Sequence, residues 1–260
     1  MLRVLTPAPT RLEAPRRVVA GARIALRSDR RNTLHGASWA LALGFELAML
    51  YVLWGGHIYG WEQSVTRTFQ DVPGHWGIYV VSSTLTNTIS IPFGLLFVAI
   101  LGFVFSRGER TGATLLLLSF PLHVLSQFPK FFFERPRPSS DFDGISGIGG
   151  LNSFPSGHSE YVITFYGFLA YLLILRLPGR AQKIAVGAGF VAFALTTGFG
   201  RIAGGRHWPM DVLTSYVIGL GLLSGLIWIH TAWQRASVVE AAEVEPIGFP
   251  APARAVAKAA

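Results

Sequence analysis

Long apolar segments separated by short polar ones make up most of this chain. Six segments of about 17–20 residues are apolar enough to span a bilayer as helices. They cover residues 37–56, 88–105, 112–129, 159–175, 184–200 and 212–230. A helix of this length, at a rise of about 1.5 Å per residue, crosses a hydrocarbon core about 30 Å thick. The pattern predicts an all-α, polytopic membrane protein built as a bundle of six transmembrane helices.

A soluble bundle of very apolar buried helices is the alternative. Of the 260 residues, 51% are hydrophobic and 14% are charged, and the mean hydropathy is +0.44. Ordinary soluble domains carry about 25% charged residues, so the composition favours a membrane protein. Pro92 and Gly94 interrupt the start of the second segment, a break that a bilayer tolerates where neighbouring helices satisfy the freed backbone groups.

The remaining residues predict two tails and two connections. Residues 1–36, rich in Arg, Ala and Pro, and residues 231–260, rich in Ala, Val, Pro and Glu, are typical of disordered cytoplasmic tails around a membrane domain at 37–230. Residues 57–87 hold aromatic side chains among polar ones, which indicates a segment lying partly among lipid headgroups. Residues 139–154 contain glycines without a preceding strand, which favours a flexible outer loop over a phosphate-binding loop.

The formal charge of +8 is arranged as expected for a membrane protein. A nucleic-acid partner is disfavoured, because no basic helix, aromatic platform or nucleic-acid module accompanies the charge. With the N-terminus in the cytoplasm, the basic residues near the inner face agree with the positive-inside tendency. These are Arg23, Arg27, Arg30, Arg31, Arg107, Arg110, Arg176, Arg180, Lys183 and Arg235. The outer set is Arg67, Lys130, Arg135, Arg137, Arg201 and Arg206.

All of the outer cations except Arg67 fall in three motif clusters, which indicates an anionic ligand at the outer face. The arrangement predicts a multi-pass protein of a bacterial-type inner membrane, with both termini in the cytoplasm and the site facing the periplasm. The basic stretch before the first apolar segment predicts an uncleaved signal anchor rather than a cleaved signal peptide. Cysteine is absent, which excludes disulfides, thiolate nucleophiles and cysteine zinc sites.

The first motif cluster, KFFFERPRP, runs from Lys130 to Pro138 at the end of the third apolar segment. Prolines on both sides of Arg137 turn the chain and can fold this arginine back toward Lys130. Lysine supplies a compact charge, and arginine supplies a planar fork that matches two phosphate oxygens. Taken alone, the cluster is better interpreted as two cations that anchor a helix end at the interface.

The second cluster, PSGH, runs from Pro155 to His158 and directly precedes the fourth apolar segment. Ser156 occupies an N-cap position, and a helix start offers unpaired N–H groups and a partial positive charge to a phosphate oxygen. Gly157 lets the backbone approach a ligand closely. On its own, a capped helix with an incidental histidine explains this cluster equally well.

The third cluster, RIAGGRHWPMD, runs from Arg201 to Asp211. Proline is tolerated in the first turn of a helix, so Pro209 predicts that the sixth helix starts near Trp208. His207 and Asp211, four residues apart, can then meet side by side. A carboxylate bonded to one imidazole nitrogen leaves the other free to attack, as in hydrolase triads. An interfacial His–Asp pair that stabilises a helix end is the simpler interpretation, but it does not account for Arg201.

Two further ionisable residues, Glu46 and His123, lie within apolar segments. Such a group is a functional candidate, or else a hydrogen-bond partner of a neighbouring residue. No grouping of His, Asp and Glu has zinc-ligand spacing, and Asp141 and Asp143 lack the remaining ligands of a calcium loop. We therefore expect metal-independent chemistry without a cofactor.

The three clusters together closely resemble the type-2 phosphatidic acid phosphatase superfamily, whose signature reads K-x6-RP, PSGH and SR-x5-H-x3-D. The match covers roughly residues 37–230, in order and with suitable spacing. One departure is Gly200, where the family commonly has serine, a change that removes one hydrogen bond near the phosphate and no catalytic group. The resemblance implies that His207 attacks phosphorus to form a phosphohistidine, that Asp211 orients His207, and that His158 protonates the leaving group.

The resemblance also implies a set of groups that hold the phosphoryl oxygens. The set is Lys130, Arg137, Ser156, Gly157 and Arg201. Their fixed charges and dipoles stabilise a transition state in which negative charge redistributes. Arg135 and Arg206 are further candidates for contact with a second phosphate.

We therefore expect a membrane phosphatase that acts on a lipid phosphate or pyrophosphate. A polyprenyl pyrophosphate such as undecaprenyl pyrophosphate is preferred, because an outward site suits recycling of that carrier. Phosphatidylglycerophosphate, phosphatidic acid and lipid A phosphate remain alternatives, since the motifs bind only the phosphoryl group that all of them share. The alternative functions are a lipid phosphotransferase and a non-catalytic protein that binds or transports lipid phosphates. The related haloperoxidases are soluble, which the apolar segments disfavour.

Overall fold

The computed structural model describes residues 34–45, 47, 49, 57–87, 91–106, 108–138 and 152–244. Within these ranges the protein is all-α, as the apolar pattern predicts, and no strand is present. A helix at 34–45 comes first. It is followed by α2 (Gly60–Gln70), α3 (His75–Thr86), α4 (Ile91–Ser106), α5 (Arg110–Ser126), the 3-10 turn η2 (Phe128–Phe131), α6 (Gly157–Tyr161), the π turn η4 (Val162–Tyr166), α7 (Gly167–Arg176), α8 (Arg180–Ala203) and α9 (Pro209–Val244).

Four helical segments are long and apolar enough to cross a membrane. They are Arg110–Phe131, Gly157–Arg176, Arg180–Ala203 and Pro209–Arg235, and they correspond to the last four predicted spans. The apolar helix at Leu96–Ser106 is shorter, and the first predicted span, 37–56, falls partly outside the described residues. These findings support a polytopic membrane protein, and the count of six helices stays a prediction.

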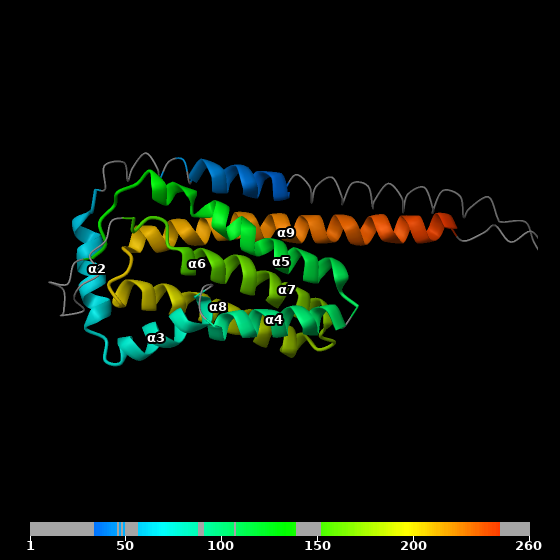
Figure 1. Ribbon diagram of the computed structural model, residues 1–260, viewed down its shortest axis with the longest axis horizontal. Helices are drawn as coiled ribbons and strands as arrows, with labels where there is room; N and C mark the ends of the chain where they lie inside the picture. The colour runs from blue at the N-terminus through cyan, green and yellow to red at the C-terminus, as the bar shows by residue number, and fades with distance from the viewer. Residues whose placement is uncertain are drawn as a thin grey trace, which may run out of the picture.

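The long helices lie side by side, and they bring all three motif clusters to one end of the bundle (Figure 1). Short connections make α7 and α8 antiparallel, so α8 ends where α6 and α9 begin. Residues 57–87 form α2 and α3. In Figure 1, α2 lies across the end of the bundle that holds the clusters, while α3 packs against α8.

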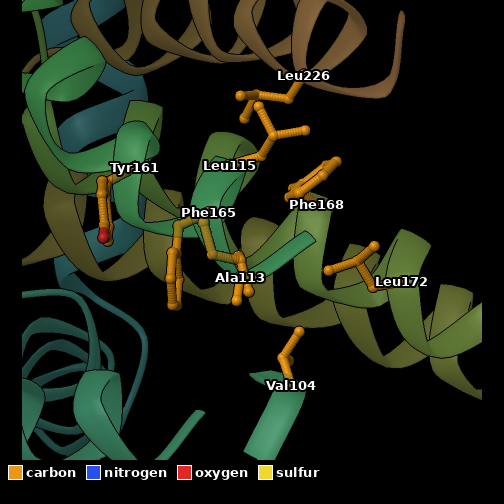
Figure 2. Close-up of a cluster of buried hydrophobic side chains, with 9 residues drawn as sticks. Val104, Ala113, Leu115, Tyr161, Phe165, Phe168, Leu172 and Leu226 are labelled. Carbon is orange, nitrogen blue, oxygen red and sulfur yellow. The ribbon is translucent and has the colours of Figure 1, made fainter. Parts of the chain in front are cut away.

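The main core joins α4, α5, α7 and α9 with α6 and η4, and Figure 2 shows its side chains from these elements. Leu115, Phe168 and Leu226 are each at most 2% exposed. Because lipid tails are as apolar as these side chains, close packing rather than water exclusion holds such helices together. At Gly219 a Cβ would lie 2.7 Å from the Ile163 Cβ, so glycine lets α9 approach η4 closely.

The predicted tail at 231–260 differs from the structure in its first part, because α9 continues to Val244. Residues 231–244 include four alanines and two glutamates, which are good helix formers. Extending an existing helix also avoids the unfavourable nucleation step. Residues 34–36 of the predicted N-terminal tail are helical as well. The other residues of both tails, 1–33 and 245–260, lie outside the described part of the chain.

Candidate active site

Four helix ends at one end of the bundle carry the residues of the motif clusters. Lys130 lies in η2 after α5, His158 in the first turn of α6, Arg201 in the last turn of α8, and His207 in the turn before α9. Figure 1 shows these four ends on the same side of the bundle as α2. The antiparallel course of the helices therefore brings together clusters that are far apart in sequence.

Three cations, Lys130, Arg137 and Arg201, form a group that is named the cradle below. Arg137 and Arg201 both lie within electrostatic range of Lys130. Among the described residues, none of the three forms an ion pair with a carboxylate. Burial lowers the pKa of Arg137, and the charge of Arg206 lowers it further. Unpaired cations held partly out of water make a strong anion-binding site.

Helix α3 holds the guanidinium group of Arg201. The Arg201 side chain is nearly buried, its Nη1 donates to the Ser83 hydroxyl at 2.9 Å, and its guanidinium carbon lies 5.4 Å from the centre of the Tyr79 ring. The buried Nε of Arg201 has no hydrogen-bond partner in the described part of the protein. Because a buried unpaired donor is unfavourable, this N–H is available to a phosphate oxygen.

The departure from the family signature at Gly200 has a packing reason. A Cβ at this position would lie 2.8 Å from the Ser82 Oγ and 3.1 Å from the Tyr79 Cα. Helix α3 therefore packs so closely against α8 that a serine side chain would not fit without moving it. The same close approach places the Ser83 hydroxyl against Arg201.

His207 is buried, and its Nδ1 lies 2.6 Å from the carbonyl oxygen of Ser153. A carbonyl oxygen only accepts hydrogen bonds, so Nδ1 carries the proton and Nε2 keeps its lone pair. Burial lowers the pKa of His207 well below its usual value, the charges of the cradle lower it further, and the bond to Ser153 opposes the shift. The ring is therefore neutral at neutral pH, as a nucleophile requires.

The structure corrects the expected direct bond between Asp211 and His207. The distance from Asp211 Oδ2 to His207 Nδ1 is 3.8 Å, and Ser153 takes the ring N–H instead. Asp211 accepts hydrogen bonds from the Trp208 N–H at 2.8 Å, from the Ser153 hydroxyl and from Arg135 Nη1. An acidic residue in the first turn of a helix accepts a hydrogen bond from the N–H that precedes the helix. The Asp211 oxygen nearest to His207 is therefore already occupied by other donors. Ser153 therefore links the two residues.

The PSGH cluster forms the start of a helix, as predicted, because α6 begins directly after Ser156. The Ser156 N–H donates to the Ser215 hydroxyl at 2.7 Å. Its own hydroxyl lies 3.0 Å from that of Ser159, so this side chain does not cap the helix. His158 is partly buried and lies within electrostatic range of His207 and of two cradle cations.

A buried acid–base pair lies beside Gly157. A Cβ on this glycine would lie 3.2 Å from His123 Cε1, so its absence lets His123 pack against the turn. His123 Nδ1 pairs with Glu160, whose other oxygen accepts a hydrogen bond from the Thr164 hydroxyl at 2.6 Å. The second ionisable residue expected within an apolar segment, Glu46, lies outside the described residues.

The two arginines suggested for a second phosphate occupy different surroundings. Arg135 is 0% exposed, and its guanidinium bonds Asp211, Glu62 and the carbonyl oxygen of His57. Because two buried carboxylates hold it inside the protein, Arg135 is not placed to bind a second phosphate. Arg206 lies over an aromatic ring of α3, and its buried Nε has no partner among the described residues. Arg206 therefore stays a candidate.

Three residues that position the site, Glu62, Ser83 and Ser153, were not anticipated from the sequence. Glu62 stands three residues after Tyr59, at the capping-box spacing, and this pattern predicts a helix start rather than a link to α9. Ser83 and Ser153 belong to no motif. Only contacts between segments that are distant in sequence identify these residues.

Comparison with known proteins agrees with the geometry. A family model described as the PAP2 superfamily matches residues 111–235. The chain is 30% identical over 145 residues to phosphatidylglycerophosphatase B of Bacillus subtilis, covering 54% of this chain and 69% of the relative. It is 29% identical over 114 residues to the lipid A 1-phosphatase of Rhizobium etli, covering 40% and 45%. A crystal structure of a transmembrane PAP2-type phosphatidylglycerolphosphate phosphatase from Bacillus subtilis shares the fold, with a TM-score of 0.57, 24% identity, and coverage of 76% of this chain and 96% of that chain.

Proposed function

The chain belongs to the PAP2 superfamily of membrane lipid phosphatases, and on that premise we propose that it hydrolyses a lipid phosphate or diphosphate through a phosphohistidine at His207. The observation that carries this proposal is the contact of 2.6 Å between His207 Nδ1 and the Ser153 carbonyl oxygen. Because a carbonyl only accepts, Nδ1 carries the proton and Nε2 keeps its lone pair, and the ring lies within electrostatic range of the cradle cations. A protein that only binds phosphate needs the cradle but no neutral, oriented histidine.

The reaction has two balanced steps. In the first, Nε2 of His207 attacks phosphorus, the bond from phosphorus to the leaving oxygen breaks, and His158 donates a proton to that oxygen. In the second, water attacks phosphorus, the P–N bond breaks, and His158 takes a proton from the water. The cradle and the Gly157 N–H hold the phosphoryl oxygens throughout, and the start of α6 adds a partial positive charge. In this scheme the fixed cations serve in place of a metal ion.

A lipid diphosphate is the substrate class that the cations of the site favour. Arg206 adds a fourth cation, and its charge acts on Arg137 of the cradle. The described residues offer Arg206 no ion-pair partner, and the second phosphate of a diphosphate supplies one. The names of the two relatives make phosphatidylglycerophosphate and a lipid A 1-phosphate the monophosphates to compare at the same site.

The orientation follows from the basic residues at the other end of the bundle. Arg110, Arg176 and Arg180 lie at the helix ends opposite the site, where the positive-inside tendency expects the cytoplasm. We therefore place the site at the outer face of a bacterial-type inner membrane, with both termini inside. The helix at 34–45 and α4 supply the first two of six spans.

Single cysteines test this orientation cleanly, because the chain has no cysteine of its own. Glu134 is exposed near the site, and Ala181 is exposed at the opposite end. In intact cells a membrane-impermeant maleimide should label Glu134→Cys and spare Ala181→Cys. The reverse pattern would refute the orientation.

The chemistry is tested by phosphate release from purified protein in detergent with EDTA present. The panel holds a polyprenyl diphosphate, the matching monophosphate, phosphatidylglycerophosphate, a lipid A 1-phosphate and phosphatidic acid. His207→Ala should lower the rate by roughly 10⁴-fold or more, whereas His75→Ala, outside the clusters, should not. Arg206→Gln should raise KM for the diphosphate more than for the monophosphate. Full activity of His207→Ala, or loss of activity in EDTA, would contradict the proposal.

A further inference from the structure

A buried series of ion pairs runs from the site into α2. Glu62 of α2, Arg135 and Asp211 of α9 each have a fully buried side chain. Arg135 Nη2 donates to Glu62 Oε2 at 2.6 Å, and its Nη1 donates to Asp211 Oδ1. The family model begins matching at residue 111, so Glu62 lies outside the matched segment.

Glu62 also holds the start of α9. Its Oε1 accepts the Met210 N–H at 3.2 Å, and its Oε2 accepts the Tyr59 N–H at 3.1 Å. Arg135 has a further acceptor in the carbonyl oxygen of His57, at 3.3 Å from Nε and 3.2 Å from Nη2. The plane of the guanidinium group is thereby fixed by two carboxylates and one carbonyl. Figure 1 shows α2 crossing the bundle where α9 begins, which is where these contacts occur.

The series reaches the nucleophile through Ser153. The Ser153 N–H donates to the carbonyl oxygen of Arg135 at 2.9 Å, and the Ser153 hydroxyl donates to Asp211. The Ser153 carbonyl oxygen in turn accepts the Nδ1–H of His207. Arg135 therefore reaches Ser153 by two routes: its backbone carbonyl accepts the Ser153 N–H, and its guanidinium group acts through Asp211. Both routes lead to the residue whose carbonyl oxygen orients His207.

We propose that Glu62 and Arg135 are positioning residues for the reaction, because the pair fixes Asp211 and Ser153 and thereby the orientation of His207. This inference rests on the proposed role of His207 as the nucleophile. Without Glu62, Arg135 would keep only Asp211 and the longer contacts to the His57 carbonyl oxygen, and the start of α9 would lose its bond to α2. Buried ion pairs add little net stability relative to apolar packing. We therefore assign to this pair the role of orienting the site rather than of stabilising the fold.

Conservative variants separate positioning from folding. Glu62→Gln keeps the size of the side chain and an acceptor for the Met210 N–H but removes the charge. Arg135→Lys keeps one charge but cannot bond two carboxylates and a carbonyl at once. The double variant tests whether the two residues act as a unit. Glu134→Gln, which removes an exposed charge from the same loop, is the matched control.

The measurements are kcat and KM on the best lipid substrate, and the affinities of inorganic phosphate and vanadate by calorimetry. We expect kcat to fall roughly 10–100-fold in each single variant, because displacing a reacting group by about 1 Å has effects of this size. KM and the affinity for phosphate should change less than about threefold, since the cradle is intact. Vanadate, which resembles the transition state and bonds to Nε2, should bind more weakly by about the same factor as kcat.

The double variant should be no worse than the worse single variant, because residues that act as one unit are not additive. Equal losses of phosphate and vanadate affinity would overturn the inference, and so would unchanged kcat in both single variants. A fall in kcat that only matches a loss of folded protein would assign the pair to stability instead. If the wild type turns over no lipid phosphate, the proposed function fails, and the comparison of vanadate with phosphate still tests the pair.

Discussion

Each end of the helix bundle holds a network of ionisable side chains that joins several helices, but the two networks lie in different surroundings. At the site end, the side chains of Glu62 and Arg135 are 0% exposed. At the opposite end, Glu109 pairs with Arg176, whose side chain is 52% exposed, and with the Nε2 of His230 at 2.9 Å. The first network is closed to water, whereas the second borders it.

This difference in exposure determines how much each network contributes to stability. Water screens the pair of Glu109 and Arg176, so the pair stabilises the contact between α5 and α7 by at most about 1 kcal/mol. Glu62 and Arg135 have no water to replace a lost partner, so each holds the other in a single geometry. The attack that we propose for His207 requires a fixed geometry, whereas a contact that only holds two helices together does not.

Of the variants considered, Arg135→Met should show the largest difference in stability between the two networks. It leaves Glu62 and Asp211 buried without their cation, which should destabilise the protein by about 3–5 kcal/mol. For a chain of this size the midpoint of thermal unfolding should fall by roughly 10 °C. Differential scanning fluorimetry in detergent measures it. The counterpart Arg176→Met should lower the midpoint by no more than about 4 °C, and equal losses would show that burial does not separate the two networks.

Acid should also act on the two ends at different pH values. Burial lowers the pKa of His207, so the unfolded chain binds a proton at pH values where the folded protein does not. Stability is therefore lost as the pH falls below about 6.5, by up to about 1.4 kcal/mol per pH unit. Burial alone would raise the pKa of Glu109, but hydrogen bonds from His230 and Arg176 outweigh burial and lower it. The contribution of Glu109 is therefore lost only below its usual value of 4.5.

Unfolding midpoints between about pH 7.5 and pH 5.5 measure this difference, since the window lies around the ordinary histidine pKa. His207→Gln should flatten the loss of stability with falling pH, because it removes one proton that only the unfolded chain takes up. Glu109→Gln should keep the slope of the wild type in this window. A wild-type slope in His207→Gln would contradict the buried, neutral state of that ring.

Four of the six spans and the meeting of the three motif clusters at one end of the bundle could be predicted from the sequence, because their signals lie along the chain. Apolar length identifies these four spans, and the spacing within short clusters makes Lys130, Arg137, Arg201 and His207 the candidates for the site. The structure brings the ends of their helices together as the antiparallel order requires. Each of these signals lies within one segment of the sequence, and it can be recognised without knowing which other segment packs against it.

The positioning network could not be predicted in the same way. The spacing of His207 and Asp211 predicts proximity, and the distance of 3.8 Å agrees. Spacing does not decide which of several nearby acceptors takes the ring N–H, and the Ser153 carbonyl lies closer. Glu62 satisfies an ordinary helix-start pattern, so its second role appears only when α2 is placed against α9. The buried position of Arg135 cannot be predicted for the same reason, since an arginine beside a phosphate motif gives no sign of the carboxylates that hold it.

Glu109→Gln tests the network at the end of the bundle opposite the site, where we expect the smallest effects. Glutamine keeps an acceptor for the ring of His230 and loses only the charge that faces half-exposed Arg176. We expect a destabilisation below about 1 kcal/mol, measured by thermal unfolding, and the difference should shrink at about 1 M salt because ions screen exposed pairs. The value of kcat/KM should stay within about twofold of the wild type, since the site lies at the other end of the bundle. A tenfold loss of activity would mean that the two ends are coupled and that Glu109 does more than tie helices together.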